Sequence, residues 1–195
     1  MTDKDISDRV RLRELKTLSD NHHVLRRADF DFRRGDGTWQ HDLRESYDMG
    51  DGAAVLPLDR TRGRVLLIRQ FRWPAFERGH HQLLVEAVAG KLDGDDPETC
   101  VIREAMEESG ITISNPQLVT HCFMSPGAVM EKLSLFLAEY DSRQPRAKGG
   151  GIGDEGEDIE SFEVTLDEGL AMIANGEIID AKTIILLQAA KLRGL

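Results

Sequence analysis

The sequence predicts an α+β protein in which a mixed β-sheet lies between helices. Stretches with strand-like alternation or short apolar runs outnumber stretches with helical periodicity. The two kinds do not follow each other in regular alternation, as they would in a doubly wound fold. The length of 195 residues suits one main domain, which would bury roughly 70% of the surface of the unfolded chain.

An antiparallel hairpin is expected near the start of the chain. Residues 23–34 alternate between apolar and polar side chains, and residues 38–49 alternate again. Between them lies Gly35-Asp36-Gly37, a sequence typical of a tight turn. We therefore expect residues 1–49 to form a separate arm and residues 50–195 to form the main domain.

The main domain is expected to begin with strands at 53–58 and 64–72, and the apolar run at 65–68 is typical of a strand buried on both faces. A loop is expected at 73–82. A strand over 83–89 should end at Gly90, before a helix that Asp95 or Asp96 caps and that Gly110 terminates. The remaining expected elements are strands at 117–124, 132–140 and 160–165, an acidic glycine-rich loop at 148–158, and helices at 167–175 and 180–193.

Composition narrows the class of protein. The formal net charge of -10 disfavours a nucleic-acid partner. Cys100 and Cys122 are too few for a disulfide framework and fit a reducing compartment. The polar start Met-Thr-Asp-Lys-Asp and the absence of an apolar run of ~20 residues predict no membrane segment. The expectation is a soluble cytoplasmic protein.

Candidate chemistry is concentrated in the segment Arg103-Glu104-Ala105-Met106-Glu107-Glu108-Ser109-Gly110. In a helix, Glu104, Glu107 and Glu108 share one side, and like charges at this spacing cost a few tenths of a kcal/mol per pair. A cation is therefore expected among them, and oxygen ligands favour Mg²⁺ or Mn²⁺. The alternative is a solvated, glutamate-rich helix face.

This segment resembles the sequence box of the Nudix hydrolase family. That box runs glycine, five residues, glutamate, seven residues, then Arg-Glu-apolar-x-Glu-Glu-x-Gly-apolar. Here Gly90 opens the box, Asp96 stands in the place of the first glutamate, and the spacer before Arg103 has six residues. The half of the box from Arg103 to Ile111 is intact.

The resemblance extends over nearly the whole chain and is strongest to the nucleoside-diphosphate-sugar branch, with GDP-mannose pyrophosphatases first and ADP-ribose pyrophosphatases next. The segments that carry it are Leu18-Ser19-Asp20-Asn21, Arg44-Glu45-Ser46-Tyr47-Asp48, Leu67-Ile68-Arg69-Gln70-Phe71-Arg72, Ala89-Gly90, Met124-Ser125-Pro126-Gly127, Gly149-Gly150-Gly151 and Asp180-Ala181-Lys182-Thr183.

The resemblance implies a role for particular residues. The metal shell comprises the main-chain carbonyl of Ala89 with Glu104, Glu108 and Glu157, and Glu107 joins these glutamates as a catalytic candidate. Gly90, Arg103 and Gly110 are structural or orienting. Substrate contacts are expected from His22, Arg44, Glu45, Arg72, Ala89, Gly90, Lys91, Glu131 and Lys182.

It also implies a Nudix fold and a homodimer whose N-terminal hairpins are exchanged, so that Arg44 and Glu45 act across the interface. The expected activity is Mg²⁺-dependent hydrolysis of a nucleoside diphosphate sugar, most simply GDP-mannose, to a nucleoside monophosphate and a sugar 1-phosphate. ADP-ribose is the alternative substrate. A sensor that binds a nucleotide sugar without cleaving it is the alternative from another class.

Two other motifs match known binding patterns only in part. Residues 151–156 match the G-x-G-x-x-G pattern, but no strand precedes them and their acidic residues would repel a pyrophosphate. The same residues lack the alternating acidic ligands of a calcium-binding loop. The pairs at 22–23 and 80–81 are histidines, but they lack the further ligand spacing of a transition-metal site. A lid that brings Glu157 to the metals accounts for the loop better.

Overall fold

The computed structural model describes residues 5–153 and 156–194. Contacts divide the chain into two compact units. The first unit comprises the chain up to Gly50 together with Ser125–Glu131, and the second comprises Asp51–Met124 and the chain from Lys132 onward.

The first unit is a three-stranded antiparallel sheet in the order β1-β2-β3. A short 3-10 helix (Ser7–Arg9) precedes β1 (Val10–Asp20), and β2 (Val24–Arg33) and β3 (Trp39–Asp48) form the expected hairpin. Strand β1 was not predicted. Its pairing with β2 shifts register between Leu12 and Glu14 and again between Thr17 and Ser19, so its side chains lose the two-residue period by which strands are recognised.

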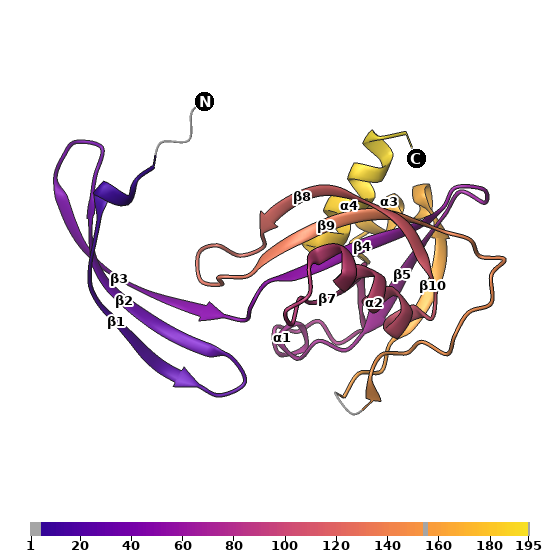
Figure 1. Cartoon of the computed structure of the whole chain (residues 1–195), viewed down its shortest axis with the longest axis horizontal. Helices are drawn as coiled ribbons and strands as arrows, with labels where there is room; N and C mark the ends of the chain where they lie inside the picture. Colours follow the sequence, from indigo (N-terminus) through magenta and orange to yellow (C-terminus); the bar gives the residue numbers. More distant parts are fainter. Residues whose placement is uncertain (1–4, 154–155, 195) are drawn as a thin grey trace. The chain divides into compact units, whose positions relative to one another are not determined.

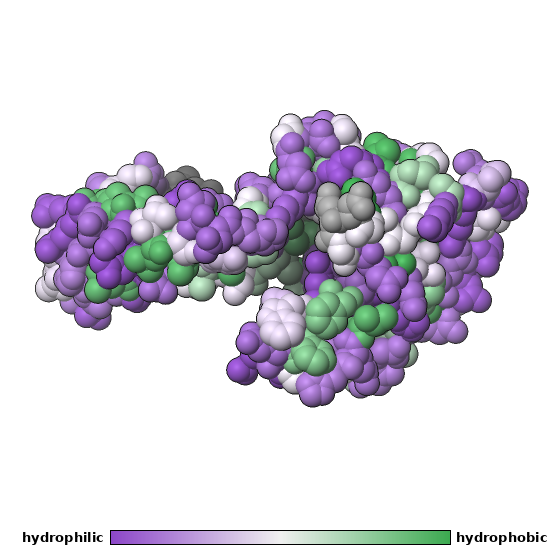
Figure 2. Space-filling view, turned by 90° about the horizontal axis from the view of Figure 1, so that it is seen from below, coloured by the Kyte–Doolittle hydropathy of each residue, from purple (hydrophilic) through white to green (hydrophobic). Residues whose placement is uncertain are grey.

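No described residue of the first unit is buried. Leu12 and Leu15 on β1 are 60% and 54% exposed, and Trp39 on β3 is 37% exposed. Figure 2 shows apolar side chains interspersed with hydrophilic ones on the surface of this unit. A three-stranded sheet without a covered face is marginal by itself in water.

The second unit is a mixed sheet in the order β10-β5-β4-β9-β8, with β6 paired to β5 and β7 paired to β4 (Figure 1). Strands β4 and β9 are parallel, and the other pairs are antiparallel. The strands are β4 (Gly52–Asp59), β5 (Arg64–Gln70), β6 (Leu84–Glu86), β7 (Val88–Lys91), β8 (Ile113–Phe123), β9 (Lys132–Tyr140) and β10 (Glu160–Thr165).

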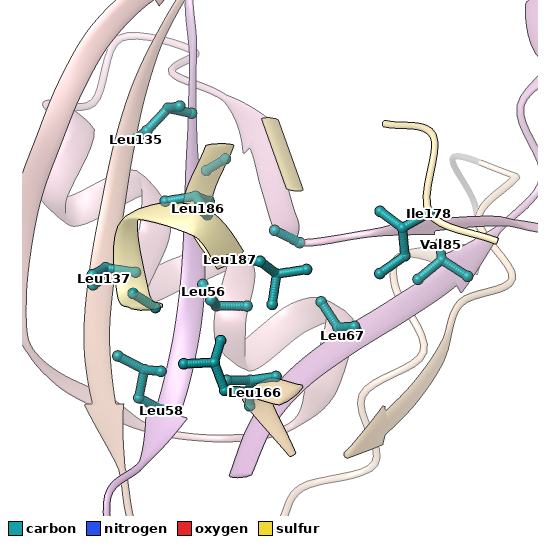
Figure 3. Close-up of a cluster of buried hydrophobic side chains, with 14 of the residues drawn as sticks. Leu56, Leu58, Leu67, Val85, Leu135, Leu137, Leu166, Ile178, Leu186 and Leu187 are labelled. Atoms are coloured by element: carbon teal, nitrogen blue, oxygen red, sulfur yellow. The ribbon is translucent and has the colours of Figure 1, made fainter. Parts of the chain in front are cut away.

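Helices cover both faces of this sheet, so its central strands are apolar on both sides, as the run at 65–68 predicted. On one face, Leu56 and Leu67 pack with α3 (Leu166–Ala174) and α4 (Ala181–Leu192), and Figure 3 shows them in one cluster with Leu186 and Leu187 of α4. On the other face, Val55 and its neighbours pack against α2 (Pro97–Ser109). The predicted mixed sheet between helices is confirmed.

In the second unit, three elements differ from the predictions in type, in number or by more than two residues. The segment expected as a loop at 73–82 begins with a short helix, α1 (Trp73–Glu77). Strand β8 begins four residues earlier than the expected 117, with an irregularity between Ser114 and Gln117 that hides its period. The expected strand at 83–89 is two strands, because the Ala87 N–H donates to the Thr183 hydroxyl (2.6 Å) where pairing changes from β5 to β4.

Within the described residues, the helices fall short of the length and apolarity that crossing a bilayer requires.

Candidate active site

Helix α2 presents the three glutamates of the box. Asp96 is its N-cap, and its side chain accepts hydrogen bonds from the N–H groups of Glu98 (3.0 Å) and Thr99 (3.1 Å). Gly110 ends the helix in the left-handed conformation, with φ of 68°. The acidic residue that departs from the family box therefore fixes where the helix begins.

Glu108 carries its carboxylate into the interior. The residue is 2% exposed, and its Oε2 accepts a hydrogen bond from the Ala89 N–H (3.2 Å). Burial raises the pKa of this carboxyl well above its ordinary value, and the charges of Glu104 and Glu157 raise it further. Burial therefore favours the protonated form of Glu108, and a cation beside it would favour the charged form.

Glu104 packs against the β7 strand at Gly90. A Cβ atom at position 90 would lie 1.9 Å from the Glu104 Oε1, so only glycine fits this close approach. Burial raises the pKa of Glu104, an effect that Arg103 opposes and the charges of Glu107 and Glu157 reinforce. The Nη1 of Arg103 donates to Glu104 (2.7 Å) and to Glu107 (3.2 Å), so this guanidinium orients both carboxylates.

The glycine-rich loop binds to the end of α2 through main-chain contacts. The N–H groups of Gly150 and Gly151 donate to the carbonyls of Glu108 (2.9 Å) and Glu107 (3.0 Å), which are unsatisfied within the helix. In the same loop, Glu157 accepts a hydrogen bond from the Ile152 N–H (2.9 Å). The acidic residues 154 and 155 lie outside the described residues.

The donor set has the chemistry of a hard divalent cation. Glu104 and Glu108 are carboxylates held close enough for the charge of Glu104 to raise the pKa of Glu108, and Ala89 and Gly90 of β7 lie beside them. Among the residues that the structure describes, however, no three Asp, Glu, His or Cys side chains converge tightly enough to hold a metal ion. The chemistry fits a cation, and occupancy would require these carboxylates to draw together.

A second charged cluster joins β6 to α4. Glu86 is 1% exposed and receives two hydrogen bonds from Arg72, Nε to Oε1 and Nη2 to Oε2, each 2.9 Å long. The Lys182 Nζ donates to Glu86 Oε2 (2.8 Å) and to Asp180 Oδ1 (3.0 Å). The two cations predicted to contact substrate, Arg72 at the N-cap of α1 and Lys182 on α4, thus meet on one buried carboxylate.

The cluster stays charged despite its burial. Burial alone would raise the pKa of Glu86, but Arg72 and Lys182 hold it below its ordinary value. Burial likewise opposes the charge of Lys182, but Glu86 and Asp180 raise its pKa. Sequence reasoning missed Glu86, although a carboxylate inside the apolar run Leu83-Leu84-Val85-Glu86-Ala87-Val88 is a signal that it has a buried partner.

The predicted site residues fall in both units. In the second unit, the structure brings Ala89, Gly90, Arg103, Glu104 and Glu108 into direct contact. Those in the first unit are His22, Arg44, Glu45 and Glu131, and those in the second are Arg72, Ala89, Gly90, Lys91, Arg103, Glu104, Glu107, Glu108, Gly110, Glu157 and Lys182.

Several of these residues have partners within their own unit. The rings of His22 and His23 are in tilted contact, with centroids 4.3 Å apart, and Arg44 is exposed and pairs with Asp42. The side chain of Lys91 is exposed, while its carbonyl accepts a hydrogen bond from Arg103 Nη2 (3.1 Å).

Comparison with known proteins covers both units. A family model described as NUDIX domain matches residues 49–187, and one described as GDP-mannose pyrophosphatase NudK N-terminal domain matches residues 9–47. A GDP-mannose pyrophosphatase of Pectobacterium atrosepticum is 43% identical over 190 residues, 97% of each chain. One of Cronobacter sakazakii is 44% identical over 187 residues, 95% of this chain and 97% of the relative.

A solved structure titled as an ADP compounds hydrolase shares the fold. Its TM-score is 0.74 at 16% sequence identity, over 98% of this chain and 97% of the other.

Proposed function

This chain belongs to the Nudix hydrolase family, and we propose that it hydrolyses GDP-mannose to GMP and mannose 1-phosphate. The observation that carries the proposal is the buried carboxylate of Glu108 with the partly buried one of Glu104, both set against Ala89 and Gly90 of β7. Full-length relatives named GDP-mannose pyrophosphatase support the choice of substrate.

The cofactor that we propose is Mg²⁺, held by the Ala89 carbonyl with Glu104, Glu108 and Glu157, with Mn²⁺ as a possible substitute. When bound, such cations neutralise phosphate charge and lower the pKa of a water that attacks phosphorus. Arg103 restricts the orientation of Glu104 and Glu107 through its hydrogen bonds to both. Glu157 either completes the ligand set or accepts the proton of the attacking water.

Arg72 and Lys182 are proposed to hold the charged groups of the substrate. Arg72 is half-exposed, and its contacts with Glu86 use Nε and Nη2, so other N–H groups of the guanidinium fork can bind a phosphate. Lys91 and the backbone of Ala89 and Gly90, all on β7, are proposed to contact the substrate as well.

The first unit is proposed to act as a dimerisation arm, which makes the protein a homodimer. Its uncovered sheet needs a partner surface, and a second copy supplies one of matching symmetry. Arg44, Glu45, His22 and Glu131 would then contribute to substrate binding, the first two across the interface. The free thiols of Cys100 and Cys122 support a cytoplasmic location.

A substrate panel tests the proposal. Purified protein with Mg²⁺ is incubated with GDP-mannose, ADP-ribose, ADP-glucose, UDP-glucose or NADH, and the initial rates are compared. We expect the highest kcat/KM for GDP-mannose. A higher value for ADP-ribose would reassign the substrate, and tight binding without any product would indicate a sensor.

A further inference from the structure

We propose that Glu86 is a positioning residue that fixes Arg72 and Lys182 where they meet the diphosphate of the substrate. The inference rests on the proposed function, but it concerns a residue to which the family box gives no role. It follows from contacts in which one buried carboxylate holds both cations.

The geometry restricts each cation separately. Arg72 makes a two-pronged contact with Glu86, which sets the plane of the guanidinium as well as its position. Lys182 is bound from two sides, by Glu86 and Asp180, and its side chain is only 10% exposed. The ammonium group of a lysine has three N–H donors. Two of them bind Glu86 and Asp180, and these two bonds fix the direction of the third.

The frame behind these contacts is also fixed. Asp180, the N-cap of α4, accepts hydrogen bonds from the Thr183 N–H (3.0 Å) and the Thr183 hydroxyl (2.6 Å). The same hydroxyl accepts a hydrogen bond from the Ala87 N–H. The start of α4 is thereby joined to the residue that follows Glu86, two positions before the Ala89 N–H that contacts Glu108.

The cluster is electrically close to the carboxylate site. The charge of Glu108 contributes to the raised pKa of Arg72, and the charge of Glu86 contributes to the raised pKa of Glu108. By holding Arg72 and Lys182, Glu86 keeps two cationic side chains beside the carboxylate site. Its own negative charge is offset by theirs. Arg72 and Lys182 together offset the two carboxylates, Glu86 and Asp180, so what the cluster offers to a diphosphate is the N–H donors that these contacts leave over.

The test is the isosteric variant Glu86→Gln, with Asp59→Asn as its matched control. Asp59 is also a buried carboxylate of the second unit, 4% exposed, but it accepts hydrogen bonds from Ser142 (2.5 Å) and the Arg62 N–H (3.1 Å). Both substitutions remove a buried charge, so both are expected to lower Tm. Only Glu86→Gln is expected to lower kcat/KM for GDP-mannose, by about 10-fold or more, chiefly through KM.

Binding of inorganic pyrophosphate, measured by calorimetry in EDTA, separates this inference from the choice of substrate. We expect wild type and Asp59→Asn to bind it alike and Glu86→Gln to bind about 10-fold more weakly. Wild type that binds pyrophosphate but hydrolyses no nucleotide sugar would remove the proposed function and leave the inference standing. Equal affinity in all three proteins, or no binding by wild type, would overturn the inference.

A double variant covers the case in which Glu86→Gln does not fold, since it leaves Lys182 buried without its main counter-charge. Adding Lys182→Met removes that charge. Relative to Lys182→Met alone, the double variant is expected to lose a further factor of about 3 in kcat/KM, because Arg72 has lost its two-pronged partner. No further loss would show that Glu86 has a purely structural role.

Discussion

At the scale of single residues, the Glu108 carboxylate is buried beside two other acidic groups. The same burial that raises its pKa makes it a strong site for a cation, because few water molecules compete there. The charged carboxylate of Glu108 thus destabilises the metal-free protein, but the proposed activity of the metal-bound protein requires it.

Glu108→Gln is expected to separate these demands. The amide oxygen can still accept the hydrogen bond from the Ala89 N–H, while the charge is gone. We expect kcat for GDP-mannose to fall by about 10²-fold or more. At about pH 8 without metal, Tm should rise by about 2–4 °C, the shift that roughly 1 kcal/mol produces in a domain of this size. Near-normal turnover would rule out the proposed role.

The pH dependence of metal-free stability is the second test at this scale. Because the folded-state pKa of Glu104 and Glu108 lies above the ordinary value of 4.5, the folded protein binds more protons than the unfolded chain just above that pH. These groups therefore contribute a stability that falls as pH rises from about 4.5 through the raised pKa. Thermal denaturation should show that Mg²⁺ raises Tm more at about pH 8 than at about pH 5. Equal shifts at both pH values would contradict this.

The sequence predicted part of this site. The spacing of Glu104, Glu107 and Glu108 was sufficient because a helix converts spacing directly into a shared face. Glu86 was not predicted, since its partners Arg72 and Lys182 lie 14 and 96 positions away and meet it only through the sheet and α4. No periodic pattern in the sequence around Glu86 therefore identifies its partners.

At the scale of elements, local signals predicted α2 and most strands of the second unit. Asp96 and Gly110 define the ends of α2 by capping chemistry, which depends on a few neighbouring residues. Strand β1 and the break between β6 and β7 were missed for a different reason. Register shifts and a bond from Ala87 to Thr183 are properties of pairing partners, which one stretch of sequence does not contain.

The junction between the glycine-rich loop and α2 gives the prediction at this scale. Gly149 has φ of +60°, and a Cβ there would lie 2.8 Å from the Ser109 carbonyl carbon. Gly149→Ala should therefore lift the loop, shift Glu157 and lower kcat by about 10-fold, with a loss of about 1–3 kcal/mol in stability.

Gly153→Ala is the matched control in the same loop, since a Cβ at that position meets nothing within 4 Å. The measurements are kcat and the free energy of unfolding in urea for both variants, and we expect only Gly149→Ala to lower them. Equal effects of the two substitutions would show that the loop has no fixed position on α2.

At the scale of the whole molecule, the net charge of -10 takes on a more specific meaning. It disfavours polyanionic partners, yet the proposed substrate carries two phosphates. Part of the negative charge belongs to α2, where a divalent cation would reverse the local sign, and Arg72 and Lys182 place cationic donors on Glu86 and Asp180. The overall charge therefore does not describe the site.

The proposed homodimer with shared sites is tested by complementation. Arg44→Ala and Glu108→Gln are each expected to be inactive as homodimers. When the two are co-expressed with different tags, mixed dimers contain one site built from two unaltered parts, so the preparation should regain about a quarter of wild-type activity. Light scattering should give the mass of a dimer. A monomeric mass at micromolar concentration, or no recovery of activity, would contradict the exchanged arm.

The most direct test of the central claim is product analysis of GDP-mannose hydrolysis in ¹⁸O-labelled water with Mg²⁺. The account predicts GMP and mannose 1-phosphate, with the label in the phosphate of one of them, because water attacks phosphorus. Release of GDP and free mannose, with the label in the sugar, would place the reaction at carbon and contradict the account.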